Sequence, residues 1–166
     1  MAYKKHKQYR LPGFDYSSNA AYFITIVTKN REHFFGEIKE GEMFLSEIGK
    51  YIEDNFKIIE STISHIQIEE YAIMPNHLHL IVTIITESNS NFEFKKGIQP
   101  LLPKSISSFI NHLKGNIKFW CISNNLSQFA WQPRFHDRII RNEKEYTAIS
   151  KYIENNVANW QHDEYL

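Results

Sequence analysis

Residues 66–85, which read IQIEEYAIMPNHLHLIVTII, determine the fold of this chain. They contain two runs rich in β-branched and apolar residues, 66–74 and 77–85, separated only by Pro75-Asn76. Such runs, bounded by turn residues, are typical of strands. A two-residue connection makes the strands neighbours, so this stretch predicts an antiparallel hairpin.

Three elements are predicted before and directly after this hairpin. Residues 22–28 (YFITIVT) have the composition of a strand. Apolar residues at three- and four-residue spacing predict two amphipathic helices. The first contains Leu45, Ile48, Ile52, Phe56 and Ile59, and the second contains Ile106, Phe109, Ile110, Leu113, Ile117 and Trp120.

The C-terminal part of the chain adds a strand and a third helix. Residues 135–140 have the composition of a strand, and Asn142 followed by Glu145 has the form of a capping box. Tyr146, Ile149, Ile153 and Val157 then form an apolar stripe. The order β-α-β-β-α-β-α predicts an α+β ferredoxin-like sandwich, with a four-stranded antiparallel sheet, two crossover helices and an added C-terminal helix.

The composition is that of one globular domain over residues 1–166. Hydrophobic residues make up 42% of the chain, enough for a packed core. Nineteen Lys and Arg balance nineteen Asp and Glu, so evidence for a nucleic-acid partner must come from local patches. The single Cys121 excludes an internal disulfide framework and a multi-cysteine zinc module.

Two segments lie outside the predicted helices and strands, and their composition also predicts structure and location. The basic N-terminal arm, residues 1–18, lacks the apolar stretch of a signal peptide, and no apolar run approaches the roughly 20 residues of a membrane helix. Residues 86–103 are polar and contain Gly97, Pro100 and Pro103, which predicts a long exposed excursion. We therefore expect a cytoplasmic protein that does not bind membranes.

The His77-Leu78-His79 triplet is a candidate metal site. Side chains alternate across a strand, so the two histidines share one face while Leu78 and Leu80 share the other. The leucine face can pack under the helices, which leaves two imidazoles close enough to hold one cation. The alternative interpretation is a pair of surface histidines on the edge of a sheet.

Tyr152 and Asn156 are a second pair of candidates, four residues apart on the third predicted helix. This spacing places the phenol and the amide on one helix face. A phenol has a pKa near 10, so it becomes a useful nucleophile only beside a metal, a base or a strong field. The alternative is an amphipathic tyrosine that buries its ring and hydrates its hydroxyl.

Basic residues gather in local patches that are candidates for DNA binding. Aromatic side chains are interleaved with the N-terminal basic residues, a mixture that contacts phosphates and stacks on bases. Solvated surface charge is the alternative for each patch. The candidate DNA-binding residues are Lys4, Lys5, Lys7, Arg10, Lys29, Arg31, Lys114, Lys118, Arg134 and Arg138.

Four segments together resemble a known family. Residues 74–82 (MPNHLHLIV) resemble the signature of HUH transposases that use one catalytic tyrosine. Residues 10–16 (RLPGFDY), the pair Trp131-Gln132 with residues 135–141 (FHDRIIR), and residues 152–156 (YIENN) resemble the branch associated with repetitive extragenic palindromes (REPs). The four segments occur in the order found in that branch.

The resemblance implies an HUH nuclease-like fold and a specific chemistry. It implies that His77 and His79 bind a divalent metal ion, Mg or Mn, with Asn156 as third ligand, although two imidazoles by softness favour zinc. It implies that Tyr152 attacks single-stranded DNA near a hairpin or palindromic repeat, leaving a 5′-phosphotyrosine and a free 3′-hydroxyl. It also implies a bacterial, nucleoid-associated enzyme that is a monomer or a homodimer. Val157 stands where relatives commonly have proline, which weakens the ligand role of Asn156.

Two alternatives belong to other functional classes. One is a catalytically inactive DNA-hairpin-binding protein derived from such a transposase, and the intact histidine pair and Tyr152 argue against it. The other is a metal hydrolase that activates water. Barrel hydrolases with paired histidines on a strand need roughly 250 residues, more than this chain has.

Overall fold

The computed structural model describes residues 19–85 and 104–166. The predictions for the basic arm 1–18, including Lys4, Lys5, Lys7 and Arg10, lie outside the described residues. So does the predicted excursion 86–103.

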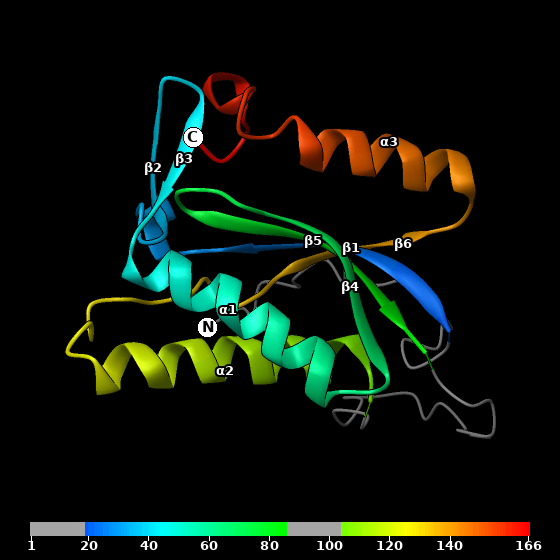
Figure 1. The fold of residues 1–166 in the computed structure, drawn as a ribbon, viewed down its shortest axis with the longest axis horizontal. Coiled ribbons are helices and arrows are strands. Elements are labelled where there is room, and N and C mark those ends of the chain that lie inside the picture. The colour runs from blue at the N-terminus through cyan, green and yellow to red at the C-terminus, as the bar shows by residue number, and fades with distance from the viewer. Residues whose placement is uncertain (1–18, 86–103) are drawn as a thin grey trace, which may run out of the picture.

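A four-stranded antiparallel sheet forms the centre of the structure (Figure 1). Its strand order is β4-β5-β1-β6, and every neighbouring pair is antiparallel. The strands are β1 (Ala20–Val27), β4 (Ile66–Ile73), β5 (His77–Ile84) and β6 (His136–Ile140). The predicted hairpin is confirmed as β4–β5, and the predicted α+β fold class is confirmed by this sheet and its helices.

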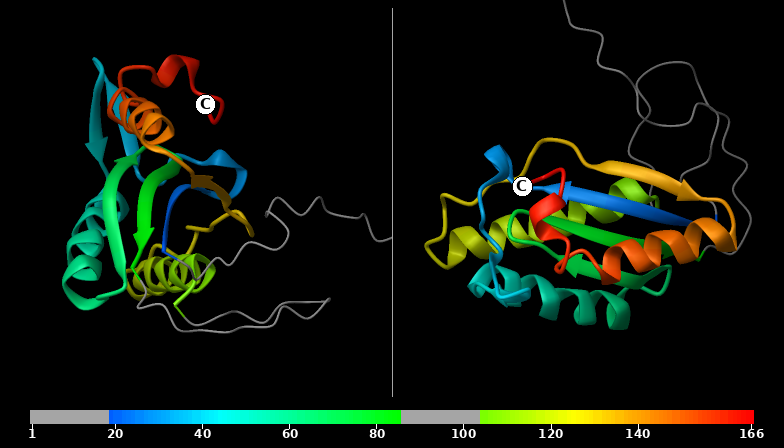
Figure 2. Two further views of the ribbon diagram at one scale, coloured as in Figure 1. Left: turned by 90° about the vertical axis from the view of Figure 1, so that its right-hand side faces the viewer. Right: turned by 90° about the horizontal axis from the view of Figure 1, so that it is seen from above.

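Helices cover both faces of the sheet. The crossover helices α1 (Glu47–Thr62) and α2 (Ile106–Ser123) lie together on one face, and α3 (Glu143–Glu154) lies on the other (Figures 1 and 2). Each helix begins at a side-chain cap, because Ser46, Ser105 and Asn142 accept a hydrogen bond from the backbone three residues on. Among the described residues, no helix is both long and apolar enough to cross a bilayer.

The alternation of β5 divides the core into two layers. Leu78, Leu80 and Val82 join the main hydrophobic cluster under α1 and α2. Ile81 faces the other way and joins a smaller cluster with Ile153 of α3. The histidines at positions 77 and 79 share the face of Ile81, which is the face that α3 covers. The sequence predicted this separation of leucines from histidines, and it is confirmed.

The structure adds a two-stranded ribbon that the sequence did not predict. It consists of β2 (Gly36–Lys39) and β3 (Glu42–Leu45), joined by a turn at Glu40 and Gly41, both with positive φ. Strands of four residues, with three charged residues among the eight, lack a long apolar run, so their pattern is weak. Leu45 therefore belongs to β3, and the first helix begins only at Glu47.

Candidate active site

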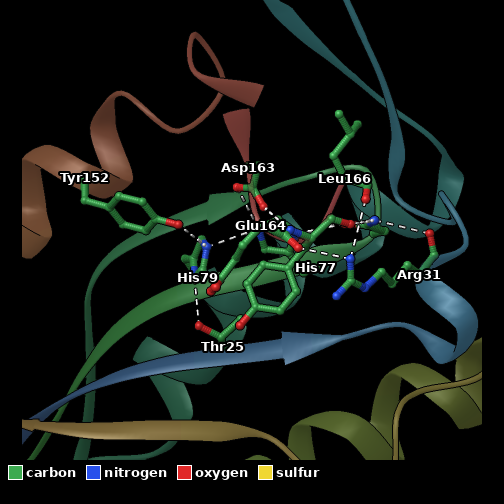
Figure 3. Close-up of polar contacts among 10 residues, drawn as sticks. Thr25, Arg31, His77, His79, Tyr152, Asp163, Glu164 and Leu166 are labelled. Carbon is green, nitrogen blue, oxygen red and sulfur yellow. Dashed lines mark hydrogen bonds and ion pairs between the residues drawn. The ribbon is translucent and has the colours of Figure 1, made fainter. Parts of the chain in front are cut away.

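The two histidines of β5 meet at their Nε2 atoms beneath α3 (Figure 3). These atoms are 3.1 Å apart, and the side chains of His77 and His79 are 0% and 1% exposed. The alternative of two surface histidines is thus excluded. Two ring nitrogens this close repel each other unless a proton or a cation lies between them.

The other nitrogen of each ring has a partner. Nδ1 of His79 lies 2.9 Å from Oγ1 of Thr25, its register partner on β1. Nδ1 of His77 lies 2.8 Å from Oδ1 of Asn76. The amide nitrogen of Asn76 donates to the carbonyl oxygens of Arg31 and Tyr165, at 3.2 and 2.7 Å, so its oxygen is left to accept. His77 therefore carries its proton on Nδ1 and directs the Nε2 lone pair toward His79.

Both histidines are neutral at physiological pH. Burial, followed by the neighbouring His79 and Arg31, lowers the pKa of His77 to about 2. Burial lowers the pKa of His79 to about 3. Neutral imidazole is the form that binds metals, and the hydrogen bonds from Nδ1 orient Nε2 as metal-binding histidines require. These residues therefore fit a metal ion.

Asp163 brings a carboxylate to the same point. Its Oδ2 lies 3.7 Å from Nε2 of His77, and one ligand atom from each of His77, His79 and Asp163 lies within 4.8 Å of the others. The backbone N–H of Tyr165 donates to its Oδ1 at 2.7 Å. Burial raises the pKa of Asp163. Sequence reasoning missed this residue, because nothing near position 163 resembles a ligand motif.

Tyr152 of α3 faces the histidine pair of its own chain. Its hydroxyl oxygen lies 3.2 Å from Nε2 of His79, and its ring packs edge-on against Phe23. Tyr152 is 43% exposed and lines an open cavity. Burial raises the pKa of Tyr152, a hydrogen bond from Asn156 lowers it, and the charges of Asp163 and Glu164 raise it.

Asn156 lies beside Tyr152 but not on its helix. Helix α3 ends at Glu154, where the backbone of Asn155 caps it, so the prediction that Asn156 belongs to this helix was wrong. Its side chain nevertheless lies beside the Tyr152 hydroxyl, as predicted. Asn156 follows in a turn, is 2% exposed, and has a side-chain oxygen with no hydrogen-bond partner in the described structure. It lines a cavity of about 660 Å³ together with His79, Tyr152 and Asp163. An unpartnered buried oxygen at this place fits a metal ligand.

The last residues of the chain close one side of the site. The ring of Tyr165 packs against His77, with centroids 4.8 Å apart, and the ring of Trp160 stacks on His77 at 6.1 Å. Arg31 donates to the carbonyl oxygen of Glu164 at 3.0 Å (Figure 3). Its guanidinium group lies over the ring of Tyr165. Burial, together with Glu164, raises the pKa of Tyr165 to about 12.

The basic residues predicted for DNA binding lie in three kinds of surroundings. Arg138 lines the cavity and pairs with Glu145 at 2.8 Å, whereas Lys29 and Arg134 are exposed.

The ammonium group of Lys114 donates to the carbonyl oxygen of Gln132 at 2.6 Å. Lys118 similarly donates to carbonyl oxygens of residues 127 and 129, and Arg31 holds the chain end. Contact of these residues with DNA stays a prediction.

Comparison with known proteins adds two findings. The chain is 34% identical over 161 residues to an uncharacterized protein of Haemophilus influenzae, covering 93% of this chain and 89% of that protein. It is similar in structure to a REP-associated tyrosine transposase solved bound to a REP hairpin. That similarity has a TM-score of 0.61 and 19% identity, and it covers 95% of this chain and 76% of the other. No protein-family model matches the chain.

Proposed function

Because this chain belongs to the same protein family as the Haemophilus influenzae protein and has the fold of a REP-associated tyrosine transposase, we propose that it cleaves and rejoins single-stranded DNA through a phosphotyrosine intermediate. One observation carries the proposal. The Tyr152 hydroxyl lies 3.2 Å from a histidine nitrogen that itself lies 3.1 Å from a second one. A nucleophile and a metal-binding pair are thus within reach of one phosphate group.

Tyr152 is the proposed nucleophile. Its oxygen attacks the scissile phosphorus and gives up its proton, while the bond from phosphorus to the 3′-oxygen breaks. The leaving oxygen takes up a proton and becomes a free 3′-hydroxyl, and the 5′-phosphate stays on the tyrosine. The new phosphodiester has the same bond type as the old one, so a 3′-hydroxyl can reverse the step and join strands.

His77 and His79 are the proposed ligands of a divalent metal ion, with Asn156 as third ligand. When bound, such an ion acts as a Lewis acid on the phosphate. Asp163 adds a carboxylate to two imidazoles, and harder oxygen donors move the preference toward Mg or Mn and away from zinc. The Tyr152 oxygen contacts the same His79 nitrogen, so it would lie next to a phosphate bound by such an ion.

The proposed substrate is single-stranded DNA with a hairpin or palindromic repeat. The structural neighbour was solved with a REP hairpin, which supports this class of partner. Arg138 in the cavity and the exposed Lys29 and Arg134 are available to contact the DNA backbone. Such an enzyme would act in the bacterial cytoplasm at the nucleoid, as a monomer or a homodimer.

Covalent capture tests this function. The full chain is incubated with labelled single-stranded DNA that carries hairpins, in Mg²⁺ or Mn²⁺, and denatured. We expect a protein–DNA adduct that EDTA prevents and that maps to Tyr152 rather than Tyr165, the second phenol in the cavity. Tyr152→Phe removes the adduct and retains DNA binding.

Tyr146→Phe is the matched control, since Tyr146 lies on the same helix and packs in the apolar cluster. It keeps the adduct. Hairpin binding without any adduct across a broad pool of substrates would contradict the proposed enzyme and support the inactive binding protein instead.

A further inference from the structure

Strand β4 contains a bulge that reverses the direction of its side chains. Ile68 pairs with Val82 and Glu70 pairs with Ile81, so Glu69 has no opposite residue. Before the bulge, Ile66 and Ile68 face α1 and α2. After it, Ala72 pairs with His79 and lies in the cluster beneath α3. The bulge therefore places Glu70 on the face of the candidate active site.

Without the bulge, strict alternation from Ile66 and Ile68 would direct position 70 into the main hydrophobic core. A carboxylate buried there among apolar side chains would lose its hydration without gaining a partner, which is strongly unfavourable. Bulges often re-aim a side chain next to a functional site. Here the re-aimed side chain meets α3, because the hydroxyl of Ser150 donates to Oε1 of Glu70 at 2.6 Å.

Ser150 and Tyr152 lie on opposite sides of the buried stripe of α3. Ile149 and Ile153 pack toward the sheet. Successive residues of an α-helix are separated by about 100° around its axis. Ser150 follows Ile149 and Tyr152 precedes Ile153, so the two side chains lie on either side of the isoleucines. Ser150 thus holds α3 to the edge strand β4 on one side. Tyr152 holds it to the central strand β5 on the other. A rotation of α3 about its own axis would have to break the Ser150 contact.

We propose that Glu70 is a positioning residue, which accepts the Ser150 hydroxyl and thereby fixes the rotation of α3 that brings the Tyr152 oxygen to His79. The inference rests on the proposed function, since it assigns Glu70 to the reaction of Tyr152. Because the tyrosine oxygen lies at the end of a long side chain, a given rotation of α3 moves it farther than it moves the backbone. A misplacement of 1 Å costs about a hundredfold in rate.

The test compares variants of Glu70 and Ser150 with a control from the same bulge. Glu70→Ala and Ser150→Ala each slow adduct formation at saturating DNA by about ten- to a hundredfold, with little change in DNA affinity. Glu70→Gln keeps a carbonyl oxygen that accepts the hydroxyl, so it retains most of the rate. Glu69→Ala removes the neighbouring exposed glutamate and leaves the rate unchanged. The double variant is no slower than either single one, because both remove one contact.

A second readout does not depend on DNA cleavage. With 3-fluorotyrosine at position 152 and no metal, the fluorine resonance shifts in Glu70→Ala and Ser150→Ala but not in Glu70→Gln or Glu69→Ala. An unchanged resonance in all variants overturns the inference. So does an adduct rate that falls across the variants only in proportion to their loss of melting temperature, because the effect would then be one of general stability. A wild-type chain that forms no adduct while the resonance shifts contradicts the proposed function and leaves the positioning role standing.

Discussion

Neutral histidines at the site follow from burial. His77 and His79 are closed off from water, and their Nδ1 atoms are occupied by Asn76 and Thr25. A charged imidazole would lose its hydration, and two charged rings whose Nε2 atoms lie 3.1 Å apart would repel each other. The protein therefore keeps both rings in the form that binds a metal, and this preference has a measurable effect on stability.

Acid should destabilise the metal-free protein. The pKa values of about 2 and 3 for His77 and His79 lie below the unfolded value of 6.5, so the unfolded chain binds more protons as pH falls. Stability is therefore fully present above pH 6.5 and is lost progressively below it, by about 1 kcal/mol per pH unit for each histidine. Urea unfolding between pH 7.5 and 5 measures this slope. The double variant His77→Gln/His79→Gln should reduce the pH dependence of the unfolding free energy. An unchanged slope would show that the two histidines do not cause it.

Removal of the Asn76 side chain should weaken metal binding. Asn76→Ala deprives Nδ1 of His77 of its acceptor, and such partners of metal-binding histidines contribute about 10- to 100-fold in affinity. Two part-buried carbonyl oxygens also lose their donor, which destabilises the fold by about 1 kcal/mol. Quenching of Trp160 fluorescence by Mn²⁺ or Co²⁺ measures the affinity, because its ring stacks on His77.

The matched control for this loss is Asn124→Ala. Asn124 donates to the carbonyl oxygen of Trp120 at the exposed end of α2, on the other face of the sheet. Its removal leaves the affinity unchanged. Equal affinities for the Asn76 and Asn124 variants would show that Asn76 does not orient His77.

At the scale of elements, the ribbon β2–β3 supports the site from the side. Ile38 of β2 packs against the cluster that contains Trp160 and Ile153. The ribbon begins at Gly36, whose φ of +143° suits glycine alone. A Cβ there would also lie inside van der Waals contact with the carbonyl oxygen of Phe44 on β3.

Two glycine substitutions should therefore have opposite effects. Gly36→Ala should destabilise the protein by about 1–3 kcal/mol, from backbone strain and the clash with β3. Gly115→Ala, in an open position of α2, should stabilise it by about 0.5–1 kcal/mol. Thermal unfolding measures both, and a stabilising Gly36→Ala would mean that the ribbon adapts freely.

At the scale of the molecule, the site is assembled from one chain. Strand β5 contributes the histidines, α3 contributes Tyr152, and the turn after η2 (Trp160–His162) contributes Asp163. Only Arg141 and Asn142 connect β6 to α3, which returns the helix over its own sheet (Figure 1). In this arrangement Tyr152 contacts His79 of its own chain.

Mixed variants test this arrangement. An equimolar mixture of Tyr152→Phe and His77→Ala/His79→Ala should form no adduct, because neither chain has both a tyrosine and a metal site. Adduct formation on the His77→Ala/His79→Ala chain would instead show that α3 is exchanged between two subunits. The wild-type chain diluted with an equal amount of Tyr152→Phe is the control, and it keeps about half of its adduct per total protein.

The sequence by itself determined the features that depend on local periodicity. Alternation along β5 separated Leu78 and Leu80 from the histidines, and three- and four-residue spacing located the helices, because each pattern repeats within one element. The tertiary structure alone decided which distant groups complete the site. Asp163 reaches His77 through a turn, and α3 ends at Glu154, so Asn156 reaches Tyr152 from beyond the helix. Thr25 reaches His79 through the β1–β5 register. Such contacts depend on where elements end and how strands align, and no short stretch of sequence contains that information.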